Sequence, residues 1–350
     1  MDSIQPEVIH QSLHKGIQYL HQHQLPNGEF CLYIGQEDDL KHTIPYSNIF
    51  STSLISYSLL KLSHLTEVQE VLERSAAFLQ YQAMRGGVWN NFTSWSPLFK
   101  VCPADIDNTA CASKVLQALK KDYPDNRDLM YNNLSYKGLF YTWYTLRPNT
   151  VWRKDYWLLI LREFKNPLKS LFFWSKFECN RNDIDGVVNA NALFYLGLNE
   201  RTDPIVNYII DIIIQNKEED CDLWYRNAFT IYYFFSRNYA NGITRLEAAR
   251  QLMIDRIFDK ANEDGSFGTG ILDTALGVIS LINLNCKSSL LTKAIHYITD
   301  NQTAYGNWIR WAVYYGGPKK LSCFGSEELT TGFCLEALSL YKSTLNNENI

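Results

Sequence analysis

The sequence repeats one pattern: an amphipathic helix, a turn rich in glycine and aromatic residues, and a second, more apolar helix. In one copy, the amphipathic segment 245–258 leads into the turn Asp264-Gly265-Ser266-Phe267-Gly268, and the apolar segment 272–284 follows. We find six such pairs, spaced by roughly 40 to 80 residues, at and beyond the upper end of helical-repeat lengths. The apolar helix of each pair is expected at 54–62, 105–119, 187–198, 224–235, 272–284 and 327–341.

This alternation constrains the fold. A helix that is apolar on all sides must be buried, whereas a helix with one apolar face covers a surface. Alternating the two kinds predicts an inner and an outer ring of helices, and no run of alternating residues typical of strands is present. We expect an all-α fold, a single α6/α6 double-ring toroidal barrel over residues 1–350, with an enlarged third repeat at about 126–182. A linear solenoid is the alternative, but a closed chain needs no polar end caps.

Composition narrows the classes of partner. The net charge is −4 and no run of Lys or Arg is present, which argues against a nucleic-acid partner. The eight Cys include no CxxC, and the first residues carry no signal-like apolar run, so we expect a cytoplasmic protein with reduced thiols. The 22 Tyr, 18 Phe and 9 Trp exceed what an ordinary core needs, and part of them could line a cavity for a large apolar or cationic guest.

The strongest candidate site is Pro103-Ala104-Asp105-Ile106-Asp107-Asn108-Thr109-Ala110, at the start of an apolar helix. One Asp or Asn at a helix start is an ordinary cap, and this stretch has more polar groups than a cap needs. The tripeptide returns in the next repeat as Asp183-Ile184-Asp185. If the inner helices are parallel, these N-termini surround one end of the central cavity, and carboxylates line its mouth.

These residues resemble the superfamily of terpenoid cyclases and protein-prenyltransferase β subunits. The resemblance extends over most of the chain through the turn 264–268 and its looser copy Gly87-Val88-Trp89. Asp105-Ile106-Asp107-Asn108-Thr109-Ala110 is similar to the Asp-x-Asp-Asp-Thr-Ala signature of class II terpene cyclases. The resemblance implies that Asp107 protonates an alkene or epoxide, that Asp105 and Asn108 are its hydrogen-bonding neighbours, and that aromatic walls guide the carbocation.

The sequence also departs from these relatives. The third acidic position of the cyclase signature is Asn108, and the chain has the length of one barrel, whereas the cyclases usually carry a second helical domain. One barrel is what prenyltransferase β subunits have, but their zinc ligands, an Asp and a Cys two apart and a distant His, find no clear match here. Which metal, if any, the chain binds therefore stays open.

The second tripeptide allows two interpretations. Asp183 and Asp185 form a second polar concentration with Asn189 and Asn191 of the helix that follows. The two Asp-x-Asp pairs on adjacent helices could hold Mg²⁺ and a diphosphate, because hard cations prefer oxygen ligands. They could equally cap a helix and form a polar seam between inner helices. Arg226 could pair with an Asp across the mouth or hold an anionic head group. The remaining candidates for substrate binding are side chains expected near the mouth, namely Trp89, Phe92, Trp224, Phe267, Asp273 and Trp308.

The leading hypothesis is a class II-type terpenoid cyclase that starts the cyclisation of a linear prenyl chain by protonation. The substrate would be a prenyl diphosphate, which would favour Mg²⁺, or a prenylated aromatic, and no redox cofactor is expected. The alternatives are a non-catalytic prenyl- or lipid-binding barrel, a prenyltransferase β-like subunit, and a carbohydrate-active enzyme in which Asp107 works with Asp185 or Glu328. The aromatic and basic third repeat, 131–177, permits a lid or a peripheral membrane contact. The oligomeric state is not determined by the sequence.

Overall fold

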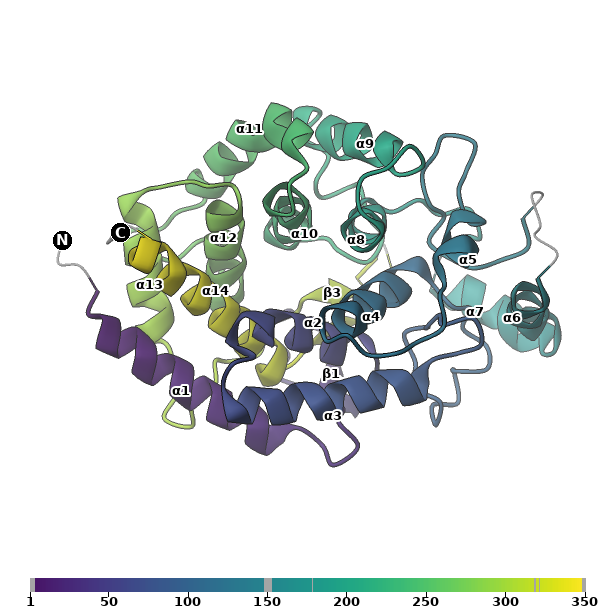
Figure 1. Ribbon diagram of the computed structural model, residues 1–350, viewed down its shortest axis with the longest axis horizontal. Helices are drawn as coiled ribbons and strands as arrows, with labels where there is room; N and C mark the ends of the chain where they lie inside the picture. The colour runs from purple at the N-terminus through teal and green to yellow at the C-terminus, as the bar shows by residue number, and fades with distance from the viewer. Residues whose placement is uncertain (1–3, 148–152, 178, 318, 321, 348–350) are drawn as a thin grey trace.

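Six helices form a closed inner ring in the computed structural model, which describes residues 4–147, 153–177, 179–317, 319–320 and 322–347 (Figure 1). Each inner helix packs on the next, and the last packs back on the first. This closure confirms the all-α double ring and excludes a linear solenoid. The inner helices are α2 (Phe50–Leu59), α4 (Ile106–Ala118), α8 (Gly186–Leu196), α10 (Ala228–Ala240), α12 (Ile271–Asn283) and α14 (Glu327–Asn347).

The outer helices lie around this ring and are buried on one side, as their amphipathic pattern requires (Figure 1). In the first of them, Ile9, Leu13 and Ile17 are buried while Val8 is exposed. Short 3₁₀ turns at Leu60–Leu62 and Thr244–Leu246 complete two of the connections. The outer helices are α1 (Pro6–His23), α3 (Thr66–Gln82), α5 (Arg127–Tyr131), α9 (Asp203–Ile214), α11 (Glu247–Phe258) and α13 (Ser289–Asp300).

The connection between α4 and α8 is the longest between inner helices. It contains the short α5 and then two further helices, α6 (Lys154–Phe164) and α7 (Pro167–Lys176), which pack on each other outside the rings (Figure 1). Residues 148–152 and 178 of this stretch lie outside the described residues. The inward face of α7 buries Phe173 and Trp174. This insertion brings aromatic side chains to one edge of the barrel.

A small antiparallel sheet that the sequence did not predict joins the two ends of the chain. Its strands, in the order β2-β1-β4-β3, are β1 (Leu32–Gly35), β2 (Ile44–Tyr46), β3 (Tyr314–Tyr315) and β4 (Cys323–Gly325). Strand β1 from the first repeat pairs with β4 from the last, with Ile34 opposite Phe324. Segments of two to four residues show too few alternations for a periodic signal.

The repeated turn has a structural role that recurs around the ring. In five repeats, an aromatic residue of the turn donates its backbone N–H to a Thr or Asn side chain on the following inner helix, over 2.8 to 3.2 Å. This bond fixes the turn against the inner helix and gives each helix a common reference position, which we call the anchor. The donor and anchor pairs are Phe30 and Thr52, Trp89 and Thr109, Phe140 and Asn189, Phe267 and Thr274, and Trp308 and Thr331.

Candidate active site

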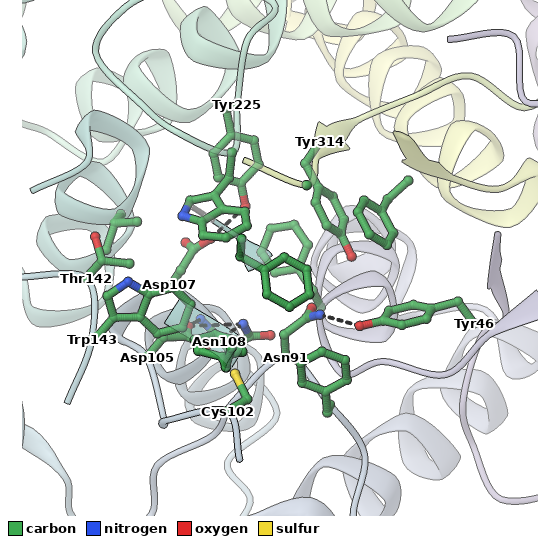
Figure 2. A pocket seen from close by; sticks show the side chains of 18 residues that line it. Tyr46, Asn91, Cys102, Asp105, Asp107, Asn108, Thr142, Trp143, Tyr225 and Tyr314 are labelled. Atoms are coloured by element: carbon green, nitrogen blue, oxygen red, sulfur yellow. Dashed lines mark hydrogen bonds between the residues drawn. The ribbon is translucent and has the colours of Figure 1, made fainter. Parts of the chain in front are cut away.

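A cavity lies at the N-terminal ends of α2, α4 and α8, bounded by α7, the loop before α10 and the small sheet (Figure 2). Its empty space amounts to about 650 Å³ with open solvent included, of which about 80 Å³ admits the centre of a water-sized sphere. Ten of its 18 lining residues are aromatic, and two, Asp105 and Asp107, are carboxylic acids. The aromatic residues are Tyr46, Phe50, Phe92, Trp143, Phe173, Phe177, Trp224, Tyr225, Tyr314 and Phe324.

Asp107 lies in the first turn of α4, two residues before the anchor Thr109. The amide of Asn191 donates to its Oδ1 over 2.6 Å, and the Tyr225 hydroxyl donates to its Oδ2 over 2.6 Å (Figure 2 shows the Tyr225 bond). Burial raises the pKa of the Asp107 carboxyl, while these two bonds and the charge of Arg237 act to lower it. Burial thus favours the protonated carboxyl, and the conjugate base has hydrogen-bond partners already in place.

Arg237 of α10 fixes the orientation of the Asn191 amide. Its guanidinium donates to Asn191 Oδ1 over 2.5 Å, so that the amide nitrogen points at Asp107. Arg237 is buried, and its guanidinium lies 4.7 to 4.9 Å from the ring centroids of Tyr57, Phe194, Tyr233 and Phe234. Such cation–π contacts compensate part of the cost of burying the charge. Arg237 acts on Asp107 through Asn191 and is a positioning residue.

Asp105 has a different function from Asp107 although it lines the same cavity. It is the N-cap of α4, where its Oδ1 accepts the backbone N–H of Asn108 over 2.7 Å, and the Asn108 amide donates to both of its oxygens over 3.0 Å. Burial raises the pKa of Asp105 to about 8, opposed by these bonds and reinforced by the nearby Asp107 carboxyl. Asp105, Asp107 and Asn108 thus lie at one cavity wall, but Asn108 bonds Asp105, and the Asp107 carboxyl accepts from Asn191 and Tyr225 instead of from the two neighbours that the resemblance implied.

The second tripeptide forms a structural link next to the cavity. Asp185 accepts the Thr142 hydroxyl over 2.5 Å and the backbone N–H of Leu223 over 3.0 Å. Asp222 accepts the N–H of Val187, Trp224 and Tyr225 over 2.9 to 3.1 Å, and so holds Tyr225 toward Asp107. Burial raises the pKa of Asp185 to about 7, and burial together with Asp185 raises that of Asp222.

Three positions of this region fit the structural alternative, a polar seam between inner helices, better than substrate binding. Asp183, Asp185 and Asn189 do not line the cavity. Asp183 accepts the backbone N–H of Asn180 over 2.6 Å, and Asn189 is an anchor whose amide bonds the backbone of Phe140 and Asp185. Their oxygens already serve the protein's own donors, because α8 begins at Gly186 and the tripeptide lies in the preceding loop.

The turn aromatics Trp89, Phe267 and Trp308, also expected at the mouth, lie between the rings instead. Trp89 and Trp308 are fully buried, and their indole N–H groups donate to backbone carbonyls of the preceding outer helices. Phe267 packs on Gly277 of α12. The anchor bonds pull each turn inward against its own helix pair, and this leaves the ring of each aromatic in the core.

Two further candidates are placed away from the cavity. Asp273 accepts the Asn227 amide over 2.7 Å and the backbone N–H and hydroxyl of Thr269 over 2.8 Å. Arg226 donates to the carbonyl of Asp222 over 3.2 Å and lies 3.7 Å from the Asp220 carboxylate. Neither residue lines the cavity, and these contacts give both a structural role at the ends of inner helices. Phe92 and Trp224, by contrast, do line the cavity.

The residues that sequence reasoning missed come from segments distant from the motif. Tyr225 contacts Asp107 from 118 residues away. The sequence groups Asn191 with Asp183 and Asp185, and its contact with Asp107, 84 residues away, was not foreseen. Tyr314 and Phe324 reach the cavity through the small sheet, where their rings stack with centroids 4.8 Å apart. Trp143 and Phe173 belong to the aromatic third repeat, and the concentration of Trp and Phe there was the one available signal.

The side chains that could ligate a metal ion are dispersed or already hydrogen-bonded within the described residues. Among the described residues, no three His, Cys, Asp or Glu side chains gather in a way that could hold a metal ion. The oxygens of Asp183 and Asp185, the expected Mg²⁺ ligands, accept protein hydrogen bonds as given above. The residues present therefore do not form a ready-made Mg²⁺ site.

Comparison of the sequence with protein-family models gives no match, and comparison with curated proteins gives none either. Comparison with solved structures finds proteins whose folds match this chain over nearly its whole length. The type II terpene cyclase MstE from Scytonema, in a variant form bound to geranylgeranyl dihydroxybenzoate, aligns with a TM-score of 0.72 at 13% identity, covering 97% of this chain and 98% of that one. Another variant of it, bound to merosterolic acid A as product, aligns with a TM-score of 0.71 at 12% identity, covering 97% of this chain and 98% of that one.

Other neighbours share the double ring. A protein from Actinoplanes aligns with a TM-score of 0.68 at 16% identity, covering 95% of this chain and 99% of that one. A possible GH105 family member from Klebsiella pneumoniae aligns with a TM-score of 0.53 at 11% identity, covering 99% of this chain and 95% of that one. The chain therefore has the fold of type II terpene cyclases, and the predicted resemblance is confirmed at the level of the fold.

Proposed function

We propose that this protein is a class II-type terpenoid cyclase in which Asp107 is the general acid. One observation carries the proposal: the Asp107 carboxyl lines an aromatic cavity, burial raises its pKa, and Asn191 and Tyr225 each donate to one of its oxygens. Protonating an alkene needs an acid that keeps its proton at neutral pH and a conjugate base that is stabilised as soon as it forms. The fold shared with MstE supports the same reaction class.

The reaction step follows from this geometry. The π electrons of a terminal isoprene unit take the Asp107 proton and form a new C–H bond, which leaves a tertiary carbocation and the Asp107 carboxylate. A second double bond of the prenyl chain attacks the cation and closes a ring, and loss of one proton ends the sequence. The product is thus an isomer of the substrate. The Tyr225 and Asn191 hydrogen bonds, at 2.6 Å each, stabilise the carboxylate during these steps.

The aromatic wall suits the charge that develops after protonation. Trp143 makes T-shaped contacts with Phe173 and Trp224, with ring centroids 5.6 and 5.7 Å apart, and these fixed contacts hold the rings in place. The faces of such rings attract a cation, and they do not react with it as water would. The aromatic side chains therefore stabilise the carbocation and guide the prenyl chain toward the acid.

For the substrate, the cavity favours a prenylated aromatic over a prenyl diphosphate. Aromatic residues dominate the cavity lining, which includes no Lys or Arg among the described residues, whereas a diphosphate binds best to Arg, Lys or a metal ion. The hydroxyl of Tyr314 is buried in the cavity and, among the described residues, has no hydrogen-bond partner. An unsatisfied buried hydroxyl is unfavourable by about 1–3 kcal/mol, and a phenol or carboxyl oxygen on the substrate's ring would pair with it.

The carbohydrate alternative finds less support in this geometry. It needs a second carboxylate across the cleft from Asp107, and neither Asp185 nor Glu328 lines the cavity. Glu328 instead accepts the Tyr19 hydroxyl over 3.4 Å. A prenyl-binding barrel without catalysis, or a prenyltransferase β-like subunit, would use the same apolar wall. Only a cyclase would need the Asp107 carboxyl in that wall as a proton donor.

The test is conversion of defined isoprenoids. Purified protein is incubated with farnesyl- and geranylgeranyl-substituted dihydroxybenzoates, and with farnesyl and geranylgeranyl diphosphates with and without Mg²⁺. The products are separated by chromatography and identified by mass spectrometry. We expect a cyclic isomer of a prenylated benzoate from the wild type and from Asp273→Asn, and none from Asp107→Asn. No conversion of any substrate, or equal conversion by Asp107→Asn, would refute the proposal.

A further inference from the structure

The α6–α7 hairpin exposes an apolar surface that the fold does not explain. Five large apolar side chains within the twelve residues 161–172 are 46% to 83% exposed. Of the 17 large hydrophobic residues that are exposed among the described residues, nearly a third lie in this short segment. Single exposed apolar residues are common, but a concentrated group marks an interaction site. We call this surface the hairpin face: Leu161, Phe164, Leu168, Leu171 and Phe172.

The hairpin itself is well packed on its other side, so the exposure does not come from a loosely attached segment. Leu159 and Ile160 of α6 are buried. Arg162 donates to the carbonyl of Phe99 over 2.6 Å, and its guanidinium lies 4.7 Å from the Phe99 ring centroid. On α7, Phe173 and Trp174 are buried next to the exposed pair Leu171 and Phe172. Both helices thus have one face in the protein and a second apolar face in solvent.

Basic residues surround the hairpin face. Residues 153–177 contain six Lys or Arg against two acidic residues, which gives a local net charge of +4 in a chain whose total is −4. Lys165 and Lys169 are exposed on either side of Leu168 in the sequence, and Lys176 lies one turn beyond Phe172. A long Lys side chain can lay its methylene groups on apolar surface and keep its charge in the polar layer above it. An apolar centre with a basic rim is the pattern of an interfacial helix.

We propose that the hairpin face docks this protein on an anionic membrane surface. Leu161, Phe164, Leu168, Leu171 and Phe172 would enter the boundary between head groups and acyl chains, and Lys165, Lys169 and Lys176 would contact anionic head groups. None of the described helices has the length and apolar character of a membrane span, so the contact is peripheral. A second copy of this chain is a poorer occupant, because an isologous contact would bring the exposed Lys165, Lys169 and Lys176 of two copies together.

The hairpin face and the cavity share the α7 segment, so docking would place the membrane surface next to the cavity wall. Phe173 and Phe177 of the α7 segment line the cavity, while Leu171 and Phe172 of the same helix point to solvent. A prenyl chain dissolved in the bilayer would therefore meet the protein beside the helix that borders the cavity. This last step rests on the proposed function, whereas the membrane contact does not.

The experiment measures binding to vesicles without any isoprenoid substrate. Wild-type protein is sedimented with phosphatidylcholine vesicles that contain or lack phosphatidylglycerol, at low and high salt. We expect partitioning into the anionic vesicles that weakens as salt rises, because salt screens the Lys contacts. The triple variant Leu168→Ser, Leu171→Ser and Phe172→Ser should lose at least tenfold in partition coefficient.

Two further variants keep the test decisive. Lys165→Glu with Lys169→Glu leaves the apolar residues in place and should abolish the preference for anionic vesicles. The matched control, Leu198→Ser, Ile214→Ser and Leu252→Ser, removes three exposed apolar residues elsewhere on the surface and should bind as the wild type does. Absence of vesicle binding by the wild type would overturn the proposal, as would unchanged binding by the triple variant. Dimerisation through this face without vesicle binding would also overturn it. Since no substrate is present, these outcomes are independent of whether the protein is a cyclase.

Discussion

Two copies of the tripeptide Asp-Ile-Asp precede neighbouring inner helices, and the structure uses them differently. In the α4 copy, the first aspartate, Asp105, caps the helix, and the second aspartate, Asp107, lies in its first turn and lines the cavity. In the α8 copy, the second aspartate, Asp185, takes the cap position, and its side chain bonds Thr142 and the backbone of Leu223. The same residues thus form an acid in one repeat and a structural link in the next.

The anchors establish the register of this comparison. Thr109 and Asn189 each bond the backbone of a turn aromatic and of the residue four positions before them. Counting two residues back from the anchor gives Asp107 in α4 but Val187 in α8. In the other three anchored helices the same position holds Phe50, Leu272 and Leu329. The tripeptide lies two residues earlier relative to the start of α8 than relative to the start of α4. For this reason the second aspartate of the α4 copy lines the cavity and that of the α8 copy does not.

The largest expected effect separates the two tripeptides directly. Asp107→Asn removes the proton donor, and we expect cyclisation to fall by at least about 10³-fold, within the range of general-acid catalysis. Asp185→Asn keeps an oxygen for Leu223 and an amide for Thr142, so activity should stay within about tenfold of the wild type. Initial rates with a prenylated benzoate measure both. A loss in Asp185→Asn as large as that in Asp107→Asn would invalidate the distinction.

The next effect concerns the support that only Asp107 receives. Tyr225→Phe removes a hydrogen bond to a carboxylate, which is worth about 1.5–3 kcal/mol, so kcat should fall about 10- to 100-fold. The bond lowers the pKa of Asp107, and its loss raises that pKa. Because the protonated acid is the active form, the alkaline limb of the pH–rate profile should move to higher pH. An unmoved limb would mean that Tyr225 only packs against the acid.

Asn191 and Asn189, two residues apart on α8, sharpen the same contrast. Asn191→Leu removes the amide between Arg237 and Asp107, and we expect at least about a tenfold loss of kcat. Asn189→Thr places in α8 the anchor residue that α4 uses, so kcat should change by less than about threefold and stability by about 1 kcal/mol. Rates and denaturant unfolding of the two variants, measured side by side, check this. Equal losses of activity would contradict the separation of cavity and anchor roles.

The smallest effect is on the pH dependence of stability. The pKa of Asp185 is about 7 in the folded protein, against about 3.9 for an ordinary Asp in the unfolded chain. Between these values the folded state holds a proton that the unfolded state has lost, so the unfolding free energy falls as pH rises. Asp105, with a pKa of about 8, adds a slope of the same sign.

Asp185→Asn cannot bind or release this proton, and its unfolding free energy should depend less on pH between 5 and 7 than that of the wild type. Urea titrations at several pH values measure the slope. A wild-type stability that rises over this range, or an unchanged slope in the variant, would show that Asp185 is ionised in the folded protein.

Much of the architecture could be predicted from the sequence because it depends on periodicity. The contrast between one-faced and fully apolar helices predicts two rings, and a surplus of polar groups at one helix start indicates Asp105, Asp107 and Asn108. The small sheet could not be predicted, since its strands are too short to show alternation. The sequence places Asp183 and Asp185 directly before a helix expected at 187–198, which begins at Gly186 in the structure, but it leaves open whether they bind Mg²⁺ or form a polar seam. Local spacing does not show that Thr142 and Leu223 supply the donors for Asp185.

The cavity wall was the hardest part to predict, for a physical reason. Trp89 and Trp308 are residue types that are common in binding sites, but the anchor bonds place them between the inner and outer rings of helices. Tyr225 and Tyr314 look like core residues, and only the closure of the ring brings them to Asp107 and its cavity. Residue types and local spacing indicate an acid, whereas the partners that adjust its pKa come from distant repeats.

The central claim is that Asp107 delivers a proton to the substrate, and deuterium labelling tests it most directly. The protein is equilibrated in D₂O, supplied with geranylgeranyl dihydroxybenzoate, and the cyclic product is analysed by mass spectrometry and NMR. The account predicts one deuterium per product molecule, on the carbon of the terminal isoprene unit that Asp107 protonates. It predicts no product from Asp107→Asn. A cyclic product without deuterium, or deuterated product from Asp107→Asn at the wild-type rate, would contradict it.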